Sequence, residues 1–221
     1  MSSVQQHGFT WENELIQNVF GATKEELKAA KQHYTSKMDL PATLNRVNGS
    51  DLSIKTTGAK NTVCMADCLR IFDAVSHTTA AAPYHMVVVS YEQEGNHKKL
   101  VSVTEVDLTD SKEALFGSLT REQIVALDTA IKRIPQKRKP TDQEHADIYA
   151  LRDELQKHSG AIQLNIKCNS QQSRLQCSFN RWTTFLSEFP DRIVAASATG
   201  EIHGKKITET ILSGRRQFGS K

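Results

Sequence analysis

Three polar residues alternate along a short β-prone segment that two turn signals enclose. The segment follows Asn-Gly-Ser at residues 48–50 and ends at Gly58. Because successive strand residues point to opposite faces, Asp51, Ser53 and Lys55 project from the same side. A carboxylate that binds Mg²⁺ and a lysine that steadies charge on a phosphate are the groups that metal-dependent phosphodiester hydrolysis uses. The same pattern also fits a half-buried edge strand whose polar face meets solvent.

Three groups of cations and amides favour a polyanionic ligand. They lie in a proline-containing loop at residues 132–140, in an amide-rich segment at residues 165–180 and near the C-terminus. Lysine and arginine release counterions when they contact phosphates, and arginine and glutamine can pair with guanine and adenine edges. A solvated loop or strand edge is the alternative for each group. The residues predicted to bind DNA are Lys137, Arg138, Lys139, Gln172, Arg174, Gln176, Arg215 and Arg216.

Composition excludes several classes of protein. The chain has 221 residues, of which 38% are hydrophobic and 24% are charged, and this balance predicts an ordinary globular protein. A net charge of +3 excludes a histone-like polycation, so any contact with nucleic acid depends on local clusters of charge. No apolar run approaches the roughly 18 residues that a membrane span needs. The first residues lack the basic start and apolar stretch of a secretory signal.

The four cysteines predict a reducing, cytoplasmic location rather than a disulfide framework. Cys64 and Cys68 are four residues apart, but Cys168 and Cys177 are too widely spaced for a structural zinc site. We therefore expect buried, inert thiols. The motifs of phosphate-binding loops, serine hydrolases and zinc proteases are absent from the sequence, which leaves nucleotide hydrolysis and serine chemistry without support.

The surrounding sequence predicts the helices and strands that must position these residues. Helices are expected at residues 11–20, 23–34, 64–75 and 180–189, and two more are expected after capping boxes that begin at Thr120 and Thr141. Strands are expected at residues 51–55, 86–92, 100–108, 162–167, 174–179 and 193–197. This order predicts a mixed α+β (α/β) fold. We expect a single domain over residues 1–221, with a helical insertion at approximately residues 118–160.

Two segments together resemble the motifs of the PD-(D/E)xK nuclease superfamily. They are Gly-Phe-Thr-Trp-Glu-Asn-Glu at residues 8–14 and Ser-Asp-Leu-Ser-Ile-Lys-Thr-Thr-Gly at residues 50–58, and residues 162–167 and 173–178 are similar to the same group. Within the superfamily, the chain most resembles small type II restriction endonucleases of bacterial and viral origin. The resemblance implies a central mixed sheet flanked by helices, Mg²⁺-dependent cleavage of double-stranded DNA, and usually a homodimer.

The resemblance assigns the family lysine to Lys55, but the acidic position two residues before it holds Ser53. Either Asp51 supplies the carboxylate from the same strand face, or Asp39 is the leading acid and Ser53 is a substituted position. The remaining candidates for a second acidic group near the metal are Glu14 and Glu92.

The sequence therefore predicts an Mg²⁺-dependent endodeoxyribonuclease of restriction type. The expected catalytic residues are Asp51, Lys55, Ser53 and Glu14, and the expected metal ligands are Asp51, Asp39 and Glu92. A non-catalytic protein that binds DNA through the basic clusters is one alternative. An RNA-processing nuclease on the same scaffold is another.

Overall fold

The computed structural model describes residues 11–33, 38–76, 82–135, 138–169 and 172–212. The chain divides into two compact units, each built from separate stretches of sequence. Unit 1 contains residues 1–60, 81–108 and 189–221, and unit 2 contains residues 61–80 and 109–188. The expected mixed α+β fold, with parallel and antiparallel strands in one sheet, is confirmed. Among the described helices, none is long and apolar enough to cross a membrane.

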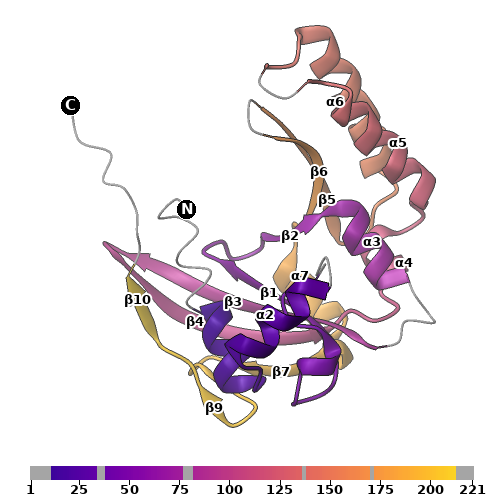
Figure 1. Ribbon diagram of the computed structural model, residues 1–221. Coiled ribbons are helices and arrows are strands. Elements are labelled where there is room, and N and C mark those ends of the chain that lie inside the picture. Colours follow the sequence, from indigo (N-terminus) through magenta and orange to yellow (C-terminus); the bar gives the residue numbers. More distant parts are fainter. Residues whose placement is uncertain (1–10, 34–37, 77–81, 136–137, 170–171, 213–221) are drawn as a thin grey trace. The chain divides into compact units, whose positions relative to one another are not determined.

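Unit 1 is built on a five-stranded sheet in which β1 is an edge strand (Figure 1). Strand β1 runs parallel to β3, whereas β3 pairs antiparallel with β4. Both β7 and β10 pair antiparallel with β4, at different positions along it. The strands are β1 (Asp51–Thr57), β3 (Tyr84–Glu94), β4 (His97–Asp107), β7 (Ile193–Ser197) and β10 (Thr210–Leu212). A separate two-stranded hairpin consists of β8 (Glu201–Ile202) and β9 (Lys205–Lys206).

One face of the unit 1 sheet forms the core. Leu52 and Ile54 alternate with the polar residues of β1 and pack against apolar residues of β3 and of the N-terminal helical segment. The expected helix at residues 11–20 is confirmed as helical, although its second half, η1 (Leu15–Val19), is a π-helix. It precedes α2 (Lys24–His33). Two short 3₁₀ turns, η2 (Ala42–Leu44) and η3 (Pro190–Arg192), complete the unit.

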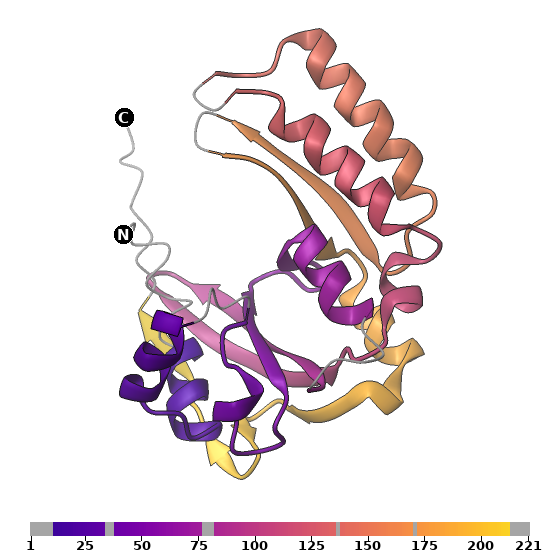
Figure 2. The same ribbon diagram turned by 45° about the vertical axis from the view of Figure 1, so that its right-hand side comes forward.

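Within its described residues, unit 2 combines a three-stranded antiparallel sheet of order β2-β6-β5 with five helices (Figure 2). The two expected capping boxes at Thr120 and Thr141 are confirmed, and each begins a helix of the expected pair. The strands are β2 (Val63–Asp67), β5 (Ile162–Asn169) and β6 (Gln172–Phe179). The helices are α3 (Cys68–Ser76), α4 (Lys112–Phe116), α5 (Arg121–Lys132), α6 (Asp142–Gln156) and α7 (Trp182–Glu188).

The prediction of a helix at residues 64–75 is wrong over its first turn. Val63 and Met65 are buried while Cys64 is exposed, which is the two-residue period of a strand. A bulge between Cys64 and Ala66, whose φ is 98°, shifts the register within β2, and the strand continues to Asp67 before α3 begins. Strand β6 also begins earlier than predicted, at Gln172, which sequence placed in the turn. The short strands β8 to β10 were not predicted.

The cysteines are only partly as expected. All four are free thiols, and Cys68 and Cys177 are buried, but Cys64 is exposed and Cys168 is half-buried. A hydrogen bond with Cys68, together with burial, raises the pKa of the Cys177 thiol well above its ordinary value. Cys177 is therefore an inert thiol, whereas the expectation of burial is wrong for Cys64.

Candidate functional site

Strand β1 carries Asp51 and Lys55 on one face, as predicted, but the strand keeps them apart. Four residues at 3.3 Å each separate them by about 13 Å along the strand. The Asp51 carboxylate turns instead toward the start of η2, where its Oδ1 accepts a hydrogen bond from the Ala42 backbone N–H at 2.8 Å. Through this hydrogen bond, Asp51 stabilises the packing of the 3₁₀ turn η2 against β1.

Asp39 is the acid that meets Lys55. A β-bridge between Leu40 and Leu52 places Asp39 beside the free edge of β1. Asp39 Oδ2 accepts hydrogen bonds from the Ile54 backbone N–H at 2.6 Å and from Lys55 Nζ at 3.0 Å. The carboxylate thus occupies the position that a backbone carbonyl of a further strand would take. Of the two alternatives that the sequence left open, only Asp39 is in contact with the lysine.

The Asp39–Lys55 ion pair lies at the boundary between protein and solvent. The side chain of Lys55 is 15% exposed and that of Asp39 is 28% exposed. Lys55 Nζ also donates to the Ile54 carbonyl at 3.1 Å, so its ammonium is held over the strand. Asp39 Oδ1 makes no hydrogen bond to any of the described residues. The pair therefore presents one oriented ammonium and one available carboxylate oxygen.

The other predicted catalytic residues do not join this pair. Ser53 lies between Asp51 and Lys55 on β1 but is only 1% exposed. Both carboxylate oxygens of Glu14 accept a hydrogen bond from the Thr208 backbone N–H at 3.0 Å. Glu92 lies four residues beyond Val88, the β3 partner of Lys55, and therefore about 13 Å further along the sheet.

A magnesium ion is the metal that this chemistry implies. Among the described residues, no three His, Cys, Asp or Glu side chains gather as metal ligands. Mg²⁺ commonly binds through only one or two protein carboxylates and completes its shell with water and substrate phosphates. Asp39 Oδ1 fits that requirement, because the hydrogen bonds to Oδ2 fix the direction of the carboxylate.

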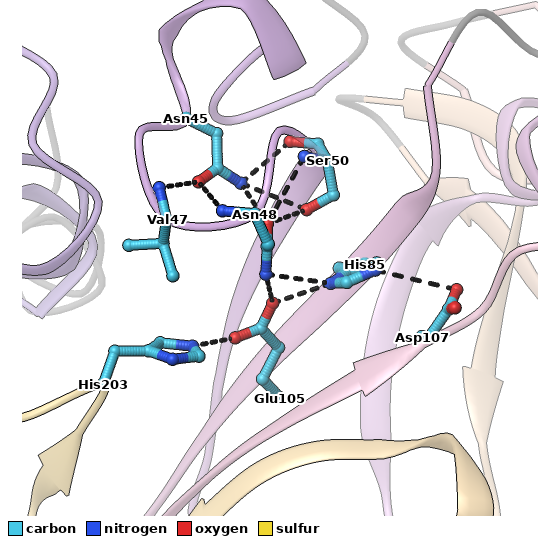
Figure 3. Close-up of polar contacts among 8 residues, drawn as sticks. All are labelled: Asn45, Val47, Asn48, Ser50, His85, Glu105, Asp107 and His203. Carbon is cyan, nitrogen blue, oxygen red and sulfur yellow. Dashed lines mark hydrogen bonds and ion pairs between the residues drawn. The ribbon is translucent and has the colours of Figure 1, made fainter.

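A second polar centre, which the sequence did not predict, surrounds Glu105 on β4 (Figure 3). The Glu105 side chain is fully buried. Its Oε1 accepts from Asn48 Nδ2 and from His85 Nδ1, both at 2.7 Å, and its Oε2 accepts from His203 Nε2. Burial raises the pKa of the Glu105 carboxyl, but the hydrogen bonds from His85, His203 and Asn48 outweigh it and hold the pKa below 4.5.

This network fastens four segments of unit 1 to one buried carboxylate. Asn48 Oδ1 accepts from Asn45 Nδ2 and from Ser50 Oγ, both at 2.8 Å, which closes the turn before β1. His203 lies in the β8–β9 hairpin, and its ring also contacts the edge of Phe20. An ionised Glu105 only accepts, so His85 must donate from Nδ1. We therefore regard the Glu105 centre as a structural hub.

Glu105 shares a sheet face with Val103 and Val87, both fully buried. A glutamate at an inward position of an apolar strand is the one sequence signal that could have indicated this centre. Its partners Asn48, His85 and His203 could not have been found, because they come from distant parts of the chain.

The predicted DNA-binding residues differ in solvent exposure and in their side-chain contacts. Arg174 and Lys139 are exposed, whereas Gln176 is only 8% exposed. Arg138 is held by Glu144, with contacts of 2.7 and 2.6 Å from its two terminal nitrogens. Gln172 opens β6. The remaining three, Lys137, Arg215 and Arg216, lie outside the described residues.

No protein-family model, curated protein or solved structure matched this chain. The resemblance to PD-(D/E)xK nucleases therefore depends on the sequence motifs alone. Function has to be inferred from the residues themselves.

Proposed function

We propose that the chain is an Mg²⁺-dependent endonuclease that cleaves duplex DNA, with Asp39 and Lys55 at the centre of its site. The observation that carries the proposal is the 3.0 Å contact between Asp39 Oδ2 and Lys55 Nζ at the edge of β1. An acid in contact with a lysine of an edge strand supplies the two kinds of group that the resemblance requires. The lysine falls at the expected position, and the acid is the one sixteen residues before it.

The chain's own residues have distinct tasks in this proposal. Asp39 Oδ1 would hold the metal while Oδ2 stays fixed by the Ile54 N–H and Lys55. When bound, Mg²⁺ supplies a Lewis acid and lowers the pKa of a coordinated water. Lys55 faces the phosphate and stabilises the negative charge that develops on it, an interaction stronger in the transition state than in the ground state. Asp51 supports the strand rather than the reaction.

Plasmid cleavage by matched variants tests the proposal. Asp39→Asn keeps a side-chain oxygen for the Ile54 N–H but removes the charge, so we expect cleavage in Mg²⁺ to fall by at least about 100-fold. Lys55→Met should lower cleavage by a similar factor. Asp51→Asn is the control on the same strand and should stay within a few-fold of the wild type. Wild-type turnover by purified Asp39→Asn protein would end the assignment.

The same digest distinguishes the alternative functions. Discrete bands from a mapped plasmid, with a dimer in sedimentation, would support a homodimeric restriction-type enzyme. Binding of DNA without cleavage in Mg²⁺ would favour a non-catalytic DNA-binding protein. Preferential cleavage of RNA would assign the site to RNA processing.

A further inference from the structure

Two like charges face each other across the β5–β6 hairpin of unit 2. Lys167 and Arg174 are direct partners in the antiparallel register, and both side chains are exposed. Neither forms an ion pair with any residue that the structure describes. Like charges directly opposite each other destabilise a sheet, so this pair is unfavourable for the fold alone.

The same sheet face contains amides and hydroxyls but little negative charge. Asn165 faces Gln176, and Gln163 faces Ser178, in the two neighbouring pairs of the register. Neither β5 nor β6 contains an acidic residue. The nearest acid in the sheet is Asp67 on β2, whose Oδ1 already accepts from the Arg70 N–H at 2.9 Å. Among the described residues, the two cations therefore have no ion-pair partner.

The start of β6 lies beside the end of α5, as both views show (Figures 1 and 2). Ser173 Oγ donates to the Ile134 carbonyl at 3.2 Å, which joins the two segments. Arg133 and Lys139 are exposed and form no ion pair within the described part of the chain. Arg138 is the exception, because Glu144 neutralises it. Because Ser173 and Arg174 point to opposite faces of β6, the segment at Ile134 lies on the face opposite to Arg174. Arg133 and Lys139 are therefore not counted with the pair.

We infer that Lys167 and Arg174 bind backbone phosphates of DNA. The surface consists of these two residues, and the inference rests on the proposed function for the choice of DNA as the polyanion. A phosphate between the two strands supplies the counter-charge that the like-charged pair lacks. The pair is assigned to phosphates rather than to base edges, and Gln176 on the same face of β6 is only 8% exposed.

Salt-dependent binding tests the inference without catalysis. Fluorescence anisotropy with a labelled 20-base-pair duplex in EDTA would compare the wild type with Lys167→Gln/Arg174→Gln. Each phosphate contact adds about 0.9 to the slope of log K against log salt, so we expect the slope to fall by about 1.8. The control Lys24→Gln/Lys157→Gln removes the same charge elsewhere and should leave the slope unchanged. The inference is overturned if the slope of Lys167→Gln/Arg174→Gln stays at the wild-type value, or if the control variant loses as much slope as this variant.

A charge reversal separates binding from folding. Lys167→Glu creates a cross-strand ion pair with Arg174, so the melting temperature should stay equal or rise while DNA affinity falls at least ten-fold. A parallel loss of melting temperature and DNA affinity would mean that the pair is structural, and would overturn the inference. Binding that depends on this pair without cleavage in Mg²⁺ would refute the nuclease and leave the inference intact. If the wild type cleaves DNA in Mg²⁺ but the Lys167→Gln/Arg174→Gln variant keeps the wild-type salt slope, the nuclease proposal stands and the inference is refuted.

Discussion

Replacement of Glu105 is the sharpest test of what holds unit 1 together. Glu105→Ala removes the acceptor of three side-chain hydrogen bonds in a fully buried site and leaves the donors of Asn48, His85 and His203 without it. Breaking one side of a buried, hydrogen-bonded charge typically costs about 3–5 kcal/mol, and we expect a loss of stability in that range. The largest part of this cost falls on His85, whose side chain is only 8% exposed and cannot easily regain a hydrogen bond from water.

Glu105→Gln should cost much less. The amide oxygen can still accept from Asn48 and His85, while the amide nitrogen can donate to His203 Nε2 if that ring changes its tautomer. The free energy of unfolding should still fall by about 1–2 kcal/mol, because these hydrogen bonds no longer have a charged acceptor. The difference between the two variants therefore measures how much of the hub depends on hydrogen-bond geometry.

Urea unfolding at pH 7 provides the measurement. The two tryptophans lie in different units, so a Trp182→Phe background leaves Trp11, in the core of unit 1, as the fluorescent reporter. Each Glu105 variant is compared with that background. Equal destabilisation by Gln and Ala, or no effect of Ala, would refute the view that three donors depend on Glu105.

The stability difference between the wild type and Glu105→Gln should depend on pH. The pKa of folded Glu105 lies below 4.5, its ordinary value, so the ionised carboxylate stabilises the fold above pH 4.5. That stabilisation disappears as the pH falls through the folded pKa. The stability gap between wild type and Glu105→Gln should thus be largest near neutral pH and shrink below pH 4.5. A gap that widens in acid would show that the carboxylate is not the stabilising form.

Two further outcomes follow from local geometry in unit 2. Thr141→Ala removes the hydroxyl that accepts from the Glu144 N–H and should destabilise α6 by about 1 kcal/mol, seen as earlier urea unfolding followed by Trp182 fluorescence. Gly117→Ala should cost at least about 1–3 kcal/mol, because φ there is 56° and a Cβ would lie 2.4 Å from the His158 carbonyl oxygen. A melting temperature within 1 °C of the wild type for Gly117→Ala would contradict this account.

Local signals in the sequence were sufficient for many elements. The capping boxes at Thr120 and Thr141 were predicted because each hydroxyl is followed three residues later by a glutamine or glutamate. The strand at residues 193–197 was predicted with its observed limits. Residues 64–67 were misread because Met65, Cys68 and Phe72 have helical spacing, while the bulge at Ala66 leaves no composition signal.

The candidate site was less predictable, because strand periodicity fixes a face but not a contact. It correctly placed Asp51 and Lys55 on one side of β1, yet the spacing along the strand separates them. Asp39 reaches Lys55 only through the bridge of Leu40 with Leu52, a tertiary contact that no local pattern encodes. The Glu105 centre depends even more on such long-range contacts.

The contacts of Trp11 have a consequence for synthesis on the ribosome. Its indole donates to the Thr208 carbonyl, 197 residues later, and β10 pairs with β4 only after residue 210 has been made. At 5–20 residues per second, the interval between these residues is about 10–40 s. During that time Trp11, Leu15 and Phe20 lack part of the core that finally buries them. Unit 1 is therefore expected to fold late, with a slow non-local step, and to need chaperone protection in the nascent chain.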